Sequence, residues 1–196
     1  MRSKSLTNEP IILASESPRR AALLSLAGFN FTVRPSRLDE ADFDEENPVA
    51  HVRTLSRLKA EKIADEVKKG LIVAADTIVV LDQRILGKPI NALEAKNMLS
   101  ALSGRTHEVY TGFTVVEQPG YRTVTEHEVT RVTFRVLDEW EIDDYVCSGE
   151  PMDKAGAYGI QDRSAVFVDH IEGCFYNVVG FPLSKFFTTL KRFKNR

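Results

Sequence analysis

Cysteine, net charge and long apolar runs are all scarce in this sequence, and each shortage excludes a class of protein. The two cysteines, Cys147 and Cys174, are too few for a disulfide scaffold and lack a metal-ligand spacing, so a reducing compartment is the simplest interpretation. The 26 Lys and Arg residues nearly balance the 28 Asp and Glu residues, which argues against a protein that coats nucleic acid. No run of about 18 uncharged apolar residues occurs, so we expect no membrane span, no signal peptide and a cytoplasmic location.

The common motifs of nucleotide-binding proteins and hydrolases are absent too. The sequence has no Walker loop, no G-x-G-x-x-G and no G-x-S-x-G. Its four histidines share no metal-ligand spacing, and we expect each to face solvent or to be satisfied by hydrogen bonds: His51, His107, His127 and His170. We interpret residues 1–196 as a single domain, with residues 1–9 flexible and the basic tail, residues 191–196, frayed.

One carboxylate interrupts the most apolar stretch of the chain, residues 71–81. This stretch is rich in β-branched residues and predicts a strand buried on both faces of an α/β sheet. Because an unpaired buried carboxylate is strongly destabilising, Asp76 must be paired, bind a metal or lie at a strand end that opens onto a cleft. A bulge or a structural Lys or Arg would explain Asp76 without any function, whereas cations elsewhere in the chain favour an anionic substrate.

The first of these cations are two arginines at the start of a predicted helix. Residues 11–14 predict a short buried strand, and residues 15–28 predict a helix with Ser17 as its N-cap and Pro18 at its first position. Arg19 and Arg20 then lie in the first turn, where positive charge opposes the helix dipole. A phosphate bound at this turn would explain them. The alternative is that both reach solvent or pair with acids elsewhere.

Two lysines are each either an ordinary surface residue or a ligand of phosphate. Residues 47–69 predict a long helix, and Lys59 lies near the centre of its apolar face. The Lys59 side chain either snorkels to the helix edge or points across a cleft at phosphate. Lys88 stands between Gly87 and Pro89, so its backbone is held while its side chain projects, as an ordinary surface lysine or as a ligand.

An acidic run and several further elements complete the chain. Residues 39–46 are a solvated loop or a source of metal ligands, and the sequence does not choose among their carboxylates. Residues 154–161 hold two closely spaced glycines, which let a ligand approach the backbone. The remaining elements that we predict are helices over residues 91–102 and 138–147 and from Pro182, a hairpin of strands 110–117 and 123–136, and strands over 165–170 and 174–179.

Taken together, several of these segments resemble one family. They are LASESPRR at residues 13–20, ADT at 75–77, GKP at 87–89, LSGRTH at 102–107, DKAGAYGIQ at 153–161 and YNVVGFPL at 176–183. The chain resembles the Maf nucleotide pyrophosphatases from about residue 11 to residue 185. The resemblance implies an α/β fold with a mixed sheet, flanking helices and two lobes around a cleft, related to the inosine triphosphate pyrophosphatases. It also implies frequent dimers, and hydrolysis of a nucleoside triphosphate to the monophosphate and pyrophosphate with Mg²⁺ or Mn²⁺.

The resemblance also implies a role for each matching residue. Asp76 takes the position of the catalytic proton acceptor, and three residues take positions associated with substrate choice: Arg19, Thr77 and Gln161. The remaining substrate-binding or metal positions match Ser15, Arg20, Glu40, Lys59, Lys88 and Lys154. The Gly-Ile-Gln form is similar to the subgroup that acts on dTTP and UTP. One difference lies after Gln161, where this chain has the residues DRS at 162–164 in place of a glycine-containing turn.

These residues suit the implied chemistry. The cations at Arg19, Arg20, Lys59, Lys88 and Lys154 would neutralise a triphosphate, and Glu40 and Asp76 are the candidate metal ligands. Asp76 would act as base, as metal ligand or as both. The Gln161 amide complements N3–H and O4 of uracil or thymine, and when flipped it complements cytosine, so CTP and modified pyrimidine triphosphates stay open.

Two other functions are alternatives to hydrolysis. A nucleotide-binding regulator of cell division would keep the basic residues without needing a base on water. An RNA-binding protein is disfavoured by the acidic balance and by the lack of an aromatic and basic stripe. The partner that we expect is a nucleotide, with a homodimer as a further expectation.

Overall fold

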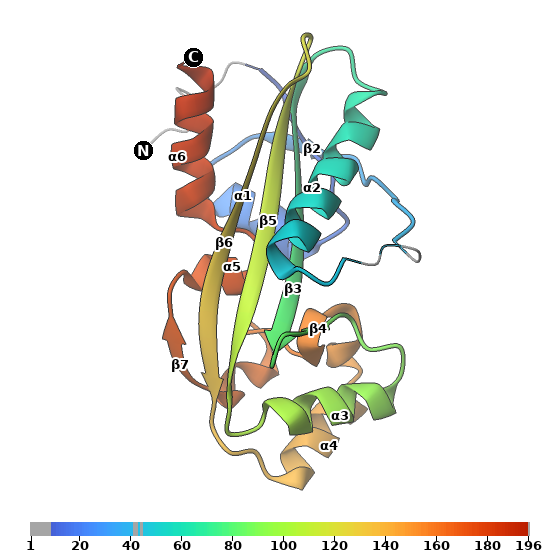
Figure 1. The fold of residues 1–196 in the computed structure, drawn as a ribbon, viewed down its shortest axis with the longest axis vertical. Coiled ribbons are helices and arrows are strands. Elements are labelled where there is room, and N and C mark those ends of the chain that lie inside the picture. The colour runs from blue at the N-terminus through green and yellow to red at the C-terminus, as the bar shows by residue number, and fades with distance from the viewer. Residues whose placement is uncertain (1–8, 41–42, 44, 196) are drawn as a thin grey trace. The chain divides into compact units, whose positions relative to one another are not determined.

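The strands of this computed structural model, which describes residues 9–40, 43 and 45–195, form one mixed sheet (Figure 1). Its order is β2-β1-β3-β5-β6-β7, and β4 pairs with β3 outside this path. β1 pairs in parallel with β2 and β3, whereas the β3–β4 and β6–β7 pairs are antiparallel. The strands are β1 (Ile11–Leu13), β2 (Phe31–Val33), β3 (Gly70–Leu81), β4 (Arg84–Leu86), β5 (Thr106–Gln118), β6 (Arg122–Phe134) and β7 (Val168–Glu172). The predicted α/β class with a mixed sheet and flanking helices is confirmed.

The chain divides into two compact units, and the division is finer than the single domain expected from the sequence. Unit 1 comprises Met1–Asp76, Thr111–Glu128 and Gly180–Arg196, and unit 2 comprises Thr77–Tyr110 and Val129–Val179. Strands β3, β5 and β6 each continue from one unit into the other. The cleft between two lobes stays a prediction.

Unit 1 is built from β1, β2, the first part of β3, and three helices: α1 (Pro18–Leu26), α2 (Pro48–Ala64) and α6 (Leu183–Lys194). Both early helices begin where the sequence predicts, because Ser17 and Asn47 cap them with their side chains. One apolar cluster joins α2 to the strands, and its buried members are Ile12, Ala14, Ala60, Ile63, Ala64, Ile72, Ala74 and Val116. The core therefore lies between the sheet and α2.

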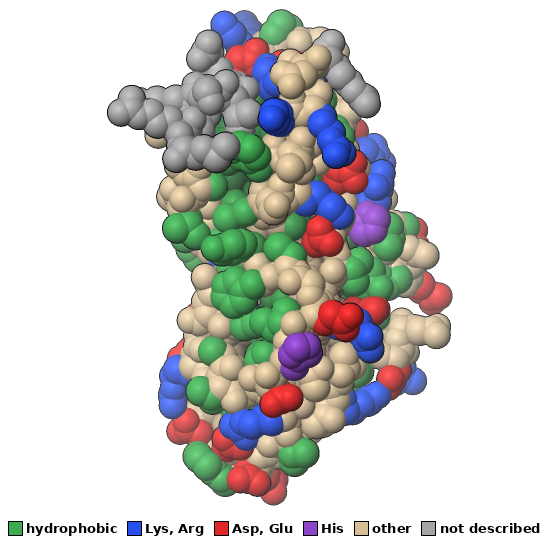
Figure 2. All heavy atoms as spheres, turned by 90° about the vertical axis from the view of Figure 1, so that its left-hand side faces the viewer, with side chains coloured by type: hydrophobic (Ala, Val, Ile, Leu, Met, Phe, Trp, Pro, Cys, Tyr) green, Lys and Arg blue, Asp and Glu red, His purple; other side chains and the backbone are tan. Residues whose placement is uncertain are grey.

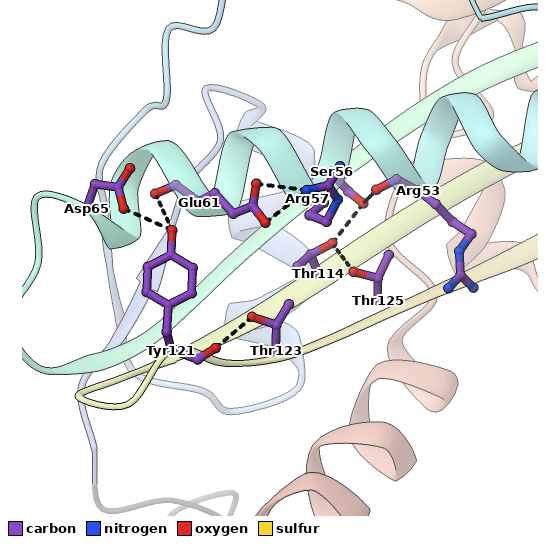
Figure 3. A network of polar contacts seen from close by, with 9 residues as sticks. All are labelled: Arg53, Ser56, Arg57, Glu61, Asp65, Thr114, Tyr121, Thr123 and Thr125. Atoms are coloured by element: carbon purple, nitrogen blue, oxygen red, sulfur yellow. Dashed lines mark hydrogen bonds and ion pairs between the residues drawn. The ribbon is translucent and has the colours of Figure 1, made fainter.

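A chain of hydroxyl groups fixes α2 on the sheet within unit 1 (Figure 3). Ser56 Oγ lies 3.0 Å from Thr114 Oγ1, which lies 2.9 Å from Thr125 Oγ1. The chain runs from α2 through β5 to β6, and both Ser56 and Thr114 are fully buried. Because buried hydroxyls are costly to leave unpaired, this chain selects one rotation of α2. Lys59 lies one turn after Ser56, so the same rotation fixes the direction of its side chain.

The predicted end of α2 is wrong, since the helix stops at Ala64 rather than near residue 69. Gln118 Nε2 donates to the Ala64 carbonyl oxygen at 3.0 Å, and Tyr121 Oη donates to Asp65 Oδ1 at 2.9 Å (Figure 3). Backbone bonds then tighten, with Val67 N donating to the Ala64 oxygen. Side chains of the β5–β6 hairpin therefore satisfy the carbonyl groups that further helix would have satisfied.

The flexibility predicted for residues 1–9 and the fraying predicted for residues 191–196 stay predictions, and described residues near both ends form ion pairs. Helix α6 continues to Lys194, whose ammonium binds Glu9 Oε2 at 2.8 Å and Glu117 Oε1 at 2.6 Å. Glu9 is thus held as well, while residues 1–8 and 196 lie outside the described residues. A basic last turn is favoured by the helix dipole, and two carboxylates strengthen that preference here.

Unit 2 is built around two helices that the sequence predicts. They are α3 (Ala92–Leu102) and α4 (Glu139–Cys147), which pack against each other (Figure 1). Asn91 caps α3, and Asp138 forms a capping box with Glu141 at the start of α4. The buried cluster of this unit includes Val79, Leu99, Leu102, Val109, Val132, Phe134, Ile142, Tyr145, Tyr158 and Phe167.

Of two strands predicted in unit 2, one is wrong and the other begins too early. Residues 174–179 contain the short helix α5 (Phe175–Val179) in place of a strand. The strand predicted over residues 165–170 is β7 (Val168–Glu172), which begins later because residues 163–167 are 3₁₀ helix. Asn177 is fully buried, and its Nδ2 donates to the Val109 oxygen at 2.9 Å and to Thr130 Oγ1 at 3.0 Å. A short apolar run cannot be assigned to helix or strand from its pattern alone. Here the hydrogen bonds of the buried Asn177 amide stabilise the helix.

The surface mixes both signs of charge. On the face in Figure 2, basic and acidic side chains are interspersed among those that the structure describes. This arrangement agrees with the formal net charge of −2. No helix within the described residues is long and apolar enough to cross a membrane.

One histidine is buried in the core of unit 2. His107 is 2% exposed, and its Nε2 lies 2.8 Å from Tyr158 Oη. Its ring also packs edge-on against Phe134 and Tyr158. The expectation that this histidine is satisfied is met at Nε2, whereas Nδ1 has no hydrogen-bond partner among the described residues. Burial lowers the pKa of His107 from 6.5 to about 4, so the folded protein holds a neutral imidazole.

Acid should therefore destabilise the protein through His107. The unfolded chain binds a proton at pH 6.5 and the folded chain only at about 4, so the stabilisation is present above pH 6.5 and is lost as the pH falls through this window. The loss should reach about 3 kcal/mol at pH 4. Urea unfolding at pH 4 to 7 measures it against His107→Gln, which is neutral throughout. Equal pH dependence of the two proteins would contradict the assignment.

Candidate functional site

The turn between β1 and α1 is held by hydrogen bonds that converge on one serine. Ser15 Oγ accepts from Ser17 N at 3.2 Å and from Arg20 Nη1 at 3.1 Å. Arg20 Nε donates to the Gly180 carbonyl oxygen at 3.0 Å, which ties the turn to the segment before α6. The sequence predicts Arg20 at an anion site, in solvent or paired with acids elsewhere, and the structure shows it half-buried and bound to Ser15 and Gly180. This arginine is a fixed charge rather than a mobile surface group.

The charges around Arg20 locate the acids of unit 1. Burial lowers the pKa of Arg20, the charge of Asp76 opposes this shift, Arg19 adds to it, and Glu40 opposes it. Asp76, Arg19 and Glu40 therefore each lie close enough to Arg20 to shift its pKa. Three elements supply them, since α1 carries the arginines, β3 carries Asp76, and the segment between β2 and α2 carries Glu40. The structure thus brings these predicted site residues together.

At the centre of this group a lysine ammonium joins two carboxylates. Lys59 Nζ lies 2.6 Å from Asp76 Oδ1 and 2.9 Å from Glu40 Oε1. The Lys59 and Asp76 side chains are 12% and 10% exposed, whereas Glu40 is half-exposed. Lys59 therefore does not snorkel to solvent. Asp76 is paired with a lysine, which is the pairing that would explain its burial without any function. That lysine, however, is itself one of the predicted site residues.

The carboxylates of this group suit a divalent cation. Asp76 Oδ2 is buried and has no hydrogen-bond partner among the described residues, although Oδ1 is paired. An oxygen left unpaired in this way is available as a ligand. Within residues 9–40, 43 and 45–195 no cluster of three or more His, Cys, Asp or Glu side chains could hold a metal. Mg²⁺ fits such a site, because it commonly takes only one or two carboxylates and completes its shell with water and substrate phosphate.

The other predicted residues belong to unit 2. Thr77 follows Asp76 on β3, exactly where the chain passes from unit 1 to unit 2. The segment with Lys88 is joined to residues 154–161, because Gly156 N donates to the Gly87 oxygen at 3.0 Å. Gly156 has a φ of +66°, and a Cβ there would lie 2.8 Å from the Val79 side chain. Only glycine lets this backbone pack against β3.

Lys154 is the buried cation of unit 2. Its side chain is 8% exposed, and Nζ donates to the Glu150 oxygen at 2.6 Å and to Asp153 Oδ1 at 2.8 Å. Asp162 Oδ2 lies 3.1 Å away. Burial lowers the pKa of Lys154, but the carboxylates of Asp153 and Asp162 outweigh burial and leave the pKa above its ordinary value. The lysine is therefore charged at neutral pH. By contrast, Lys88 and Gln161 are exposed.

Some of the groups that hold Arg20 and Lys154 in place could not be predicted from the sequence. The Gly180 and Glu150 carbonyl groups act through the backbone, which no side-chain pattern reveals. Asp162 was visible only as a departure from the family pattern. A rule that looks for carboxylates flanking a buried lysine would have found Asp153 and Asp162.

The sheet order and the helices define the class of fold. The structure resembles that of a HAM1 protein from Coxiella burnetii, with a TM-score of 0.51 and 17% identity, over 94% of this chain and 99% of that one. At this identity the likeness concerns the fold alone, and it confirms the fold relationship expected from the sequence.

The family follows from the sequence comparison. The model of the Maf-like proteins matches residues 10–193, and the chain belongs to this family. A Bacillus cereus (strain AH820) protein named dTTP/UTP pyrophosphatase is 49% identical over 183 residues, which cover 93% of this chain and 95% of the relative. A Bacillus mycoides (strain KBAB4) protein of the same name shows the same identity and the same coverage of both chains.

Replacing Lys59 should destabilise unit 1 sharply. Lys59→Met leaves the Asp76 carboxylate buried without its cation, which should cost about 3 kcal/mol of unfolding free energy. The double variant with Asp76→Asn should recover most of this loss. Urea unfolding at pH 7 measures both. Lys62→Met is the matched control, because its exposed ammonium donates to the Arg37 carbonyl oxygen and no ion pair is formed by it among the described residues. A Lys59→Met protein as stable as the control would contradict the pairing.

Proposed function

We propose that the chain hydrolyses dTTP and UTP to the nucleoside monophosphate and pyrophosphate. The observation that carries the proposal is the Lys59 group of unit 1, in which two carboxylates meet one buried ammonium beside Arg20. Membership of the Maf-like family supports the reaction, and the names of relatives at 49% identity support the choice of nucleotide.

Unit 1 carries the phosphate and proton chemistry in this proposal. Arg19, Arg20 and the N-terminus of α1 supply positive charge for phosphate oxygens, and Ser15 keeps Arg20 in place. The Lys59 ammonium has three N–H groups, and the two carboxylates that it binds account for two of them. A phosphate oxygen would accept from the third. Neutralised in this way, the triphosphate admits attack by water.

Asp76 is the proton acceptor in the proposed reaction. A water oxygen attacks the α-phosphorus, the bond from that phosphorus to the bridging oxygen breaks, and pyrophosphate leaves with the bridging oxygen. The proton of the water passes to the Asp76 carboxylate. Glu40 and Asp76 would hold a Mg²⁺ or Mn²⁺ ion, which supplies further charge neutralisation when bound. The unpaired Oδ2 of Asp76 supports both roles for this residue.

Unit 2 carries the recognition of the nucleotide in this proposal. Lys88 binds phosphate, while Thr77 and Gln161 select the base. Lys154 contributes positive charge without a direct hydrogen bond, because Glu150, Asp153 and Asp162 already occupy its three N–H groups. The exposed Gln161 amide accepts from N3–H and donates to O4 of thymine or uracil. The flipped amide suits cytosine, so CTP and modified pyrimidine triphosphates are secondary candidates. Further parts of the proposal are a cytoplasmic location, a homodimer, a role in removing unwanted nucleotides, and no nucleic-acid partner.

Asp76→Asn should lower pyrophosphate release from dTTP and UTP by at least about 100-fold. The amide cannot accept the proton of water and is a poorer metal ligand. The assay uses a panel of common triphosphates with Mg²⁺ or Mn²⁺, and repeats it with the metal chelated, which should abolish release. Asp82→Asn is the control, because this exposed acid lies in the β3–β4 turn and binds Arg105.

The same panel separates hydrolysis from its alternative. A regulator of cell division that senses nucleotides would bind dTTP without releasing pyrophosphate, or its slow release would be unaffected by Asp76→Asn. Either result would overturn the proposed function.

Gln161→Glu should lower kcat/KM for dTTP and UTP by at least about tenfold. A carboxylate accepts from N3–H but has no proton to donate to O4, and its charge repels the base carbonyl. Steady-state rates with both nucleotides measure the loss. Gln83→Glu, in the exposed β3–β4 turn, makes the same chemical change away from residues 154–161. Undiminished rates for Gln161→Glu would remove the base-selecting role.

A further inference from the structure

Gln161 lies at the tip of a closed turn. Asp162 N donates to the Gly159 carbonyl oxygen at 3.0 Å, so residues 159–162 form a β-turn with Gln161 at its third position. The direction in which the Gln161 amide points therefore depends on how firmly Gly159 and Asp162 are held.

The first end of the turn is held by a buried serine. Ser164 Oγ lies 3.0 Å from both the amide nitrogen and the carbonyl oxygen of Gly159, and 3.0 Å from Tyr145 Oη. Ser164 is fully buried, and Tyr145 is 3% exposed. These contacts anchor Gly159 to the core of unit 2.

The second end of the turn is held by charge. The Asp162 carboxylate forms an ion pair with the Lys154 ammonium at 3.1 Å, and apart from this pair its buried Oδ2 has no hydrogen-bond partner among the described residues. Lys154 is itself fixed by Glu150 and Asp153. The carboxylate at the end of the turn is thus attached to a buried and immobile cation.

Gly159 has no room for a side chain because this ion pair lies against it. A Cβ at Gly159 would lie 2.4 Å from Asp162 Oδ2 and 2.7 Å from Lys154 Cε. The backbone of the turn, the carboxylate and the lysine stem therefore form one close-packed unit, which cannot shift in one part without the others.

We propose that Asp162 is a positioning residue for base selection: its ion pair with Lys154 holds the turn at residues 159–162 so that Gln161 presents its amide in one orientation. Asp162 does not touch the base in this scheme. It acts through Gln161, and it joins the residue that selects the base to the buried positive charge of Lys154. The proposal rests on the function proposed above. It also explains why an aspartate at position 162 would be useful where the family pattern has a glycine-containing turn.

The test compares dTTP with dCTP, which share the sugar and differ in the base edge that Gln161 faces. Asp162→Asn removes the charge at nearly constant size and should leave the turn loose enough for the amide to flip. The ratio of kcat/KM for dTTP to that for dCTP should fall by about tenfold, mainly through a higher KM for dTTP. Asp162→Glu keeps the charge and should restore most of the ratio.

Two controls separate positioning from loss of the lysine or of the fold. Asp153→Asn removes the other carboxylate on Lys154 but leaves the turn intact, so it should weaken both nucleotides equally. Arg163→Ala removes the exposed pair with Asp144 and should change neither constant. Melting temperatures report folding, and Asp162→Ala serves as a second variant. A preserved dTTP/dCTP ratio in Asp162→Asn, or a fall of that ratio in Asp153→Asn as large as in Asp162→Asn, would overturn the inference.

Measurements of nucleotide binding distinguish a failure of the proposed function from a failure of the inference about Asp162. Calorimetry with dTTP and with dCTP, with metal chelated, should show the same loss of preference in Asp162→Asn as the kinetics. If the wild-type protein releases no pyrophosphate but Asp162→Asn abolishes its binding preference, the proposed function fails and the inference stands. If the wild-type protein hydrolyses dTTP and the variant keeps its preference, only the inference fails. Equal wild-type binding of the two nucleotides would also overturn the inference.

Discussion

The structure of unit 1 depends on a lysine ammonium that binds two carboxylates, the buried Asp76 and the half-exposed Glu40. Asp76 interrupts an otherwise apolar strand, and without Lys59 its charge would be buried alone. The helix that carries Lys59 is fixed in rotation by the buried hydroxyls of Ser56 and Thr114, and its end is set by the β5–β6 hairpin. Much of the fold of this unit thus serves to keep one charge pair in place.

Unit 2 also contains a buried lysine bound by two carboxylates. Lys154 is also buried, also charged and also fixed by two carboxylates, but both partners lie on a loop that contains glycines, whereas those of Lys59 lie on β3 and on the segment between β2 and α2. In the proposed reaction each unit keeps one lysine aligned before any nucleotide binds. Fixed charges of this kind stabilise a polyphosphate without the entropy cost of ordering a long side chain on binding.

Residues with a local signal were predicted well from the sequence. Ser17, Asn47, Asn91 and Asp138 cap helices where expected, and the apolar run around Asp76 is the long strand β3. The failures share one cause, which is contact between residues far apart in sequence. Asn177 makes a helix of an apolar run, and Gln118 ends α2 early. Arg19, Arg20, Glu40, Lys59 and Asp76 were predicted to converge, and they do in unit 1, but the carbonyl of Gly180 had no signal.

Hydrolysis of dTTP in ¹⁸O-labelled water tests the central claim most directly, because the label records which phosphorus the water attacks. Attack at the α-phosphorus, which the account predicts, puts one ¹⁸O into the monophosphate and none into pyrophosphate. Mass spectrometry of the two products after a single turnover resolves the outcome. Label in pyrophosphate, or release of inorganic phosphate in its place, would contradict the account.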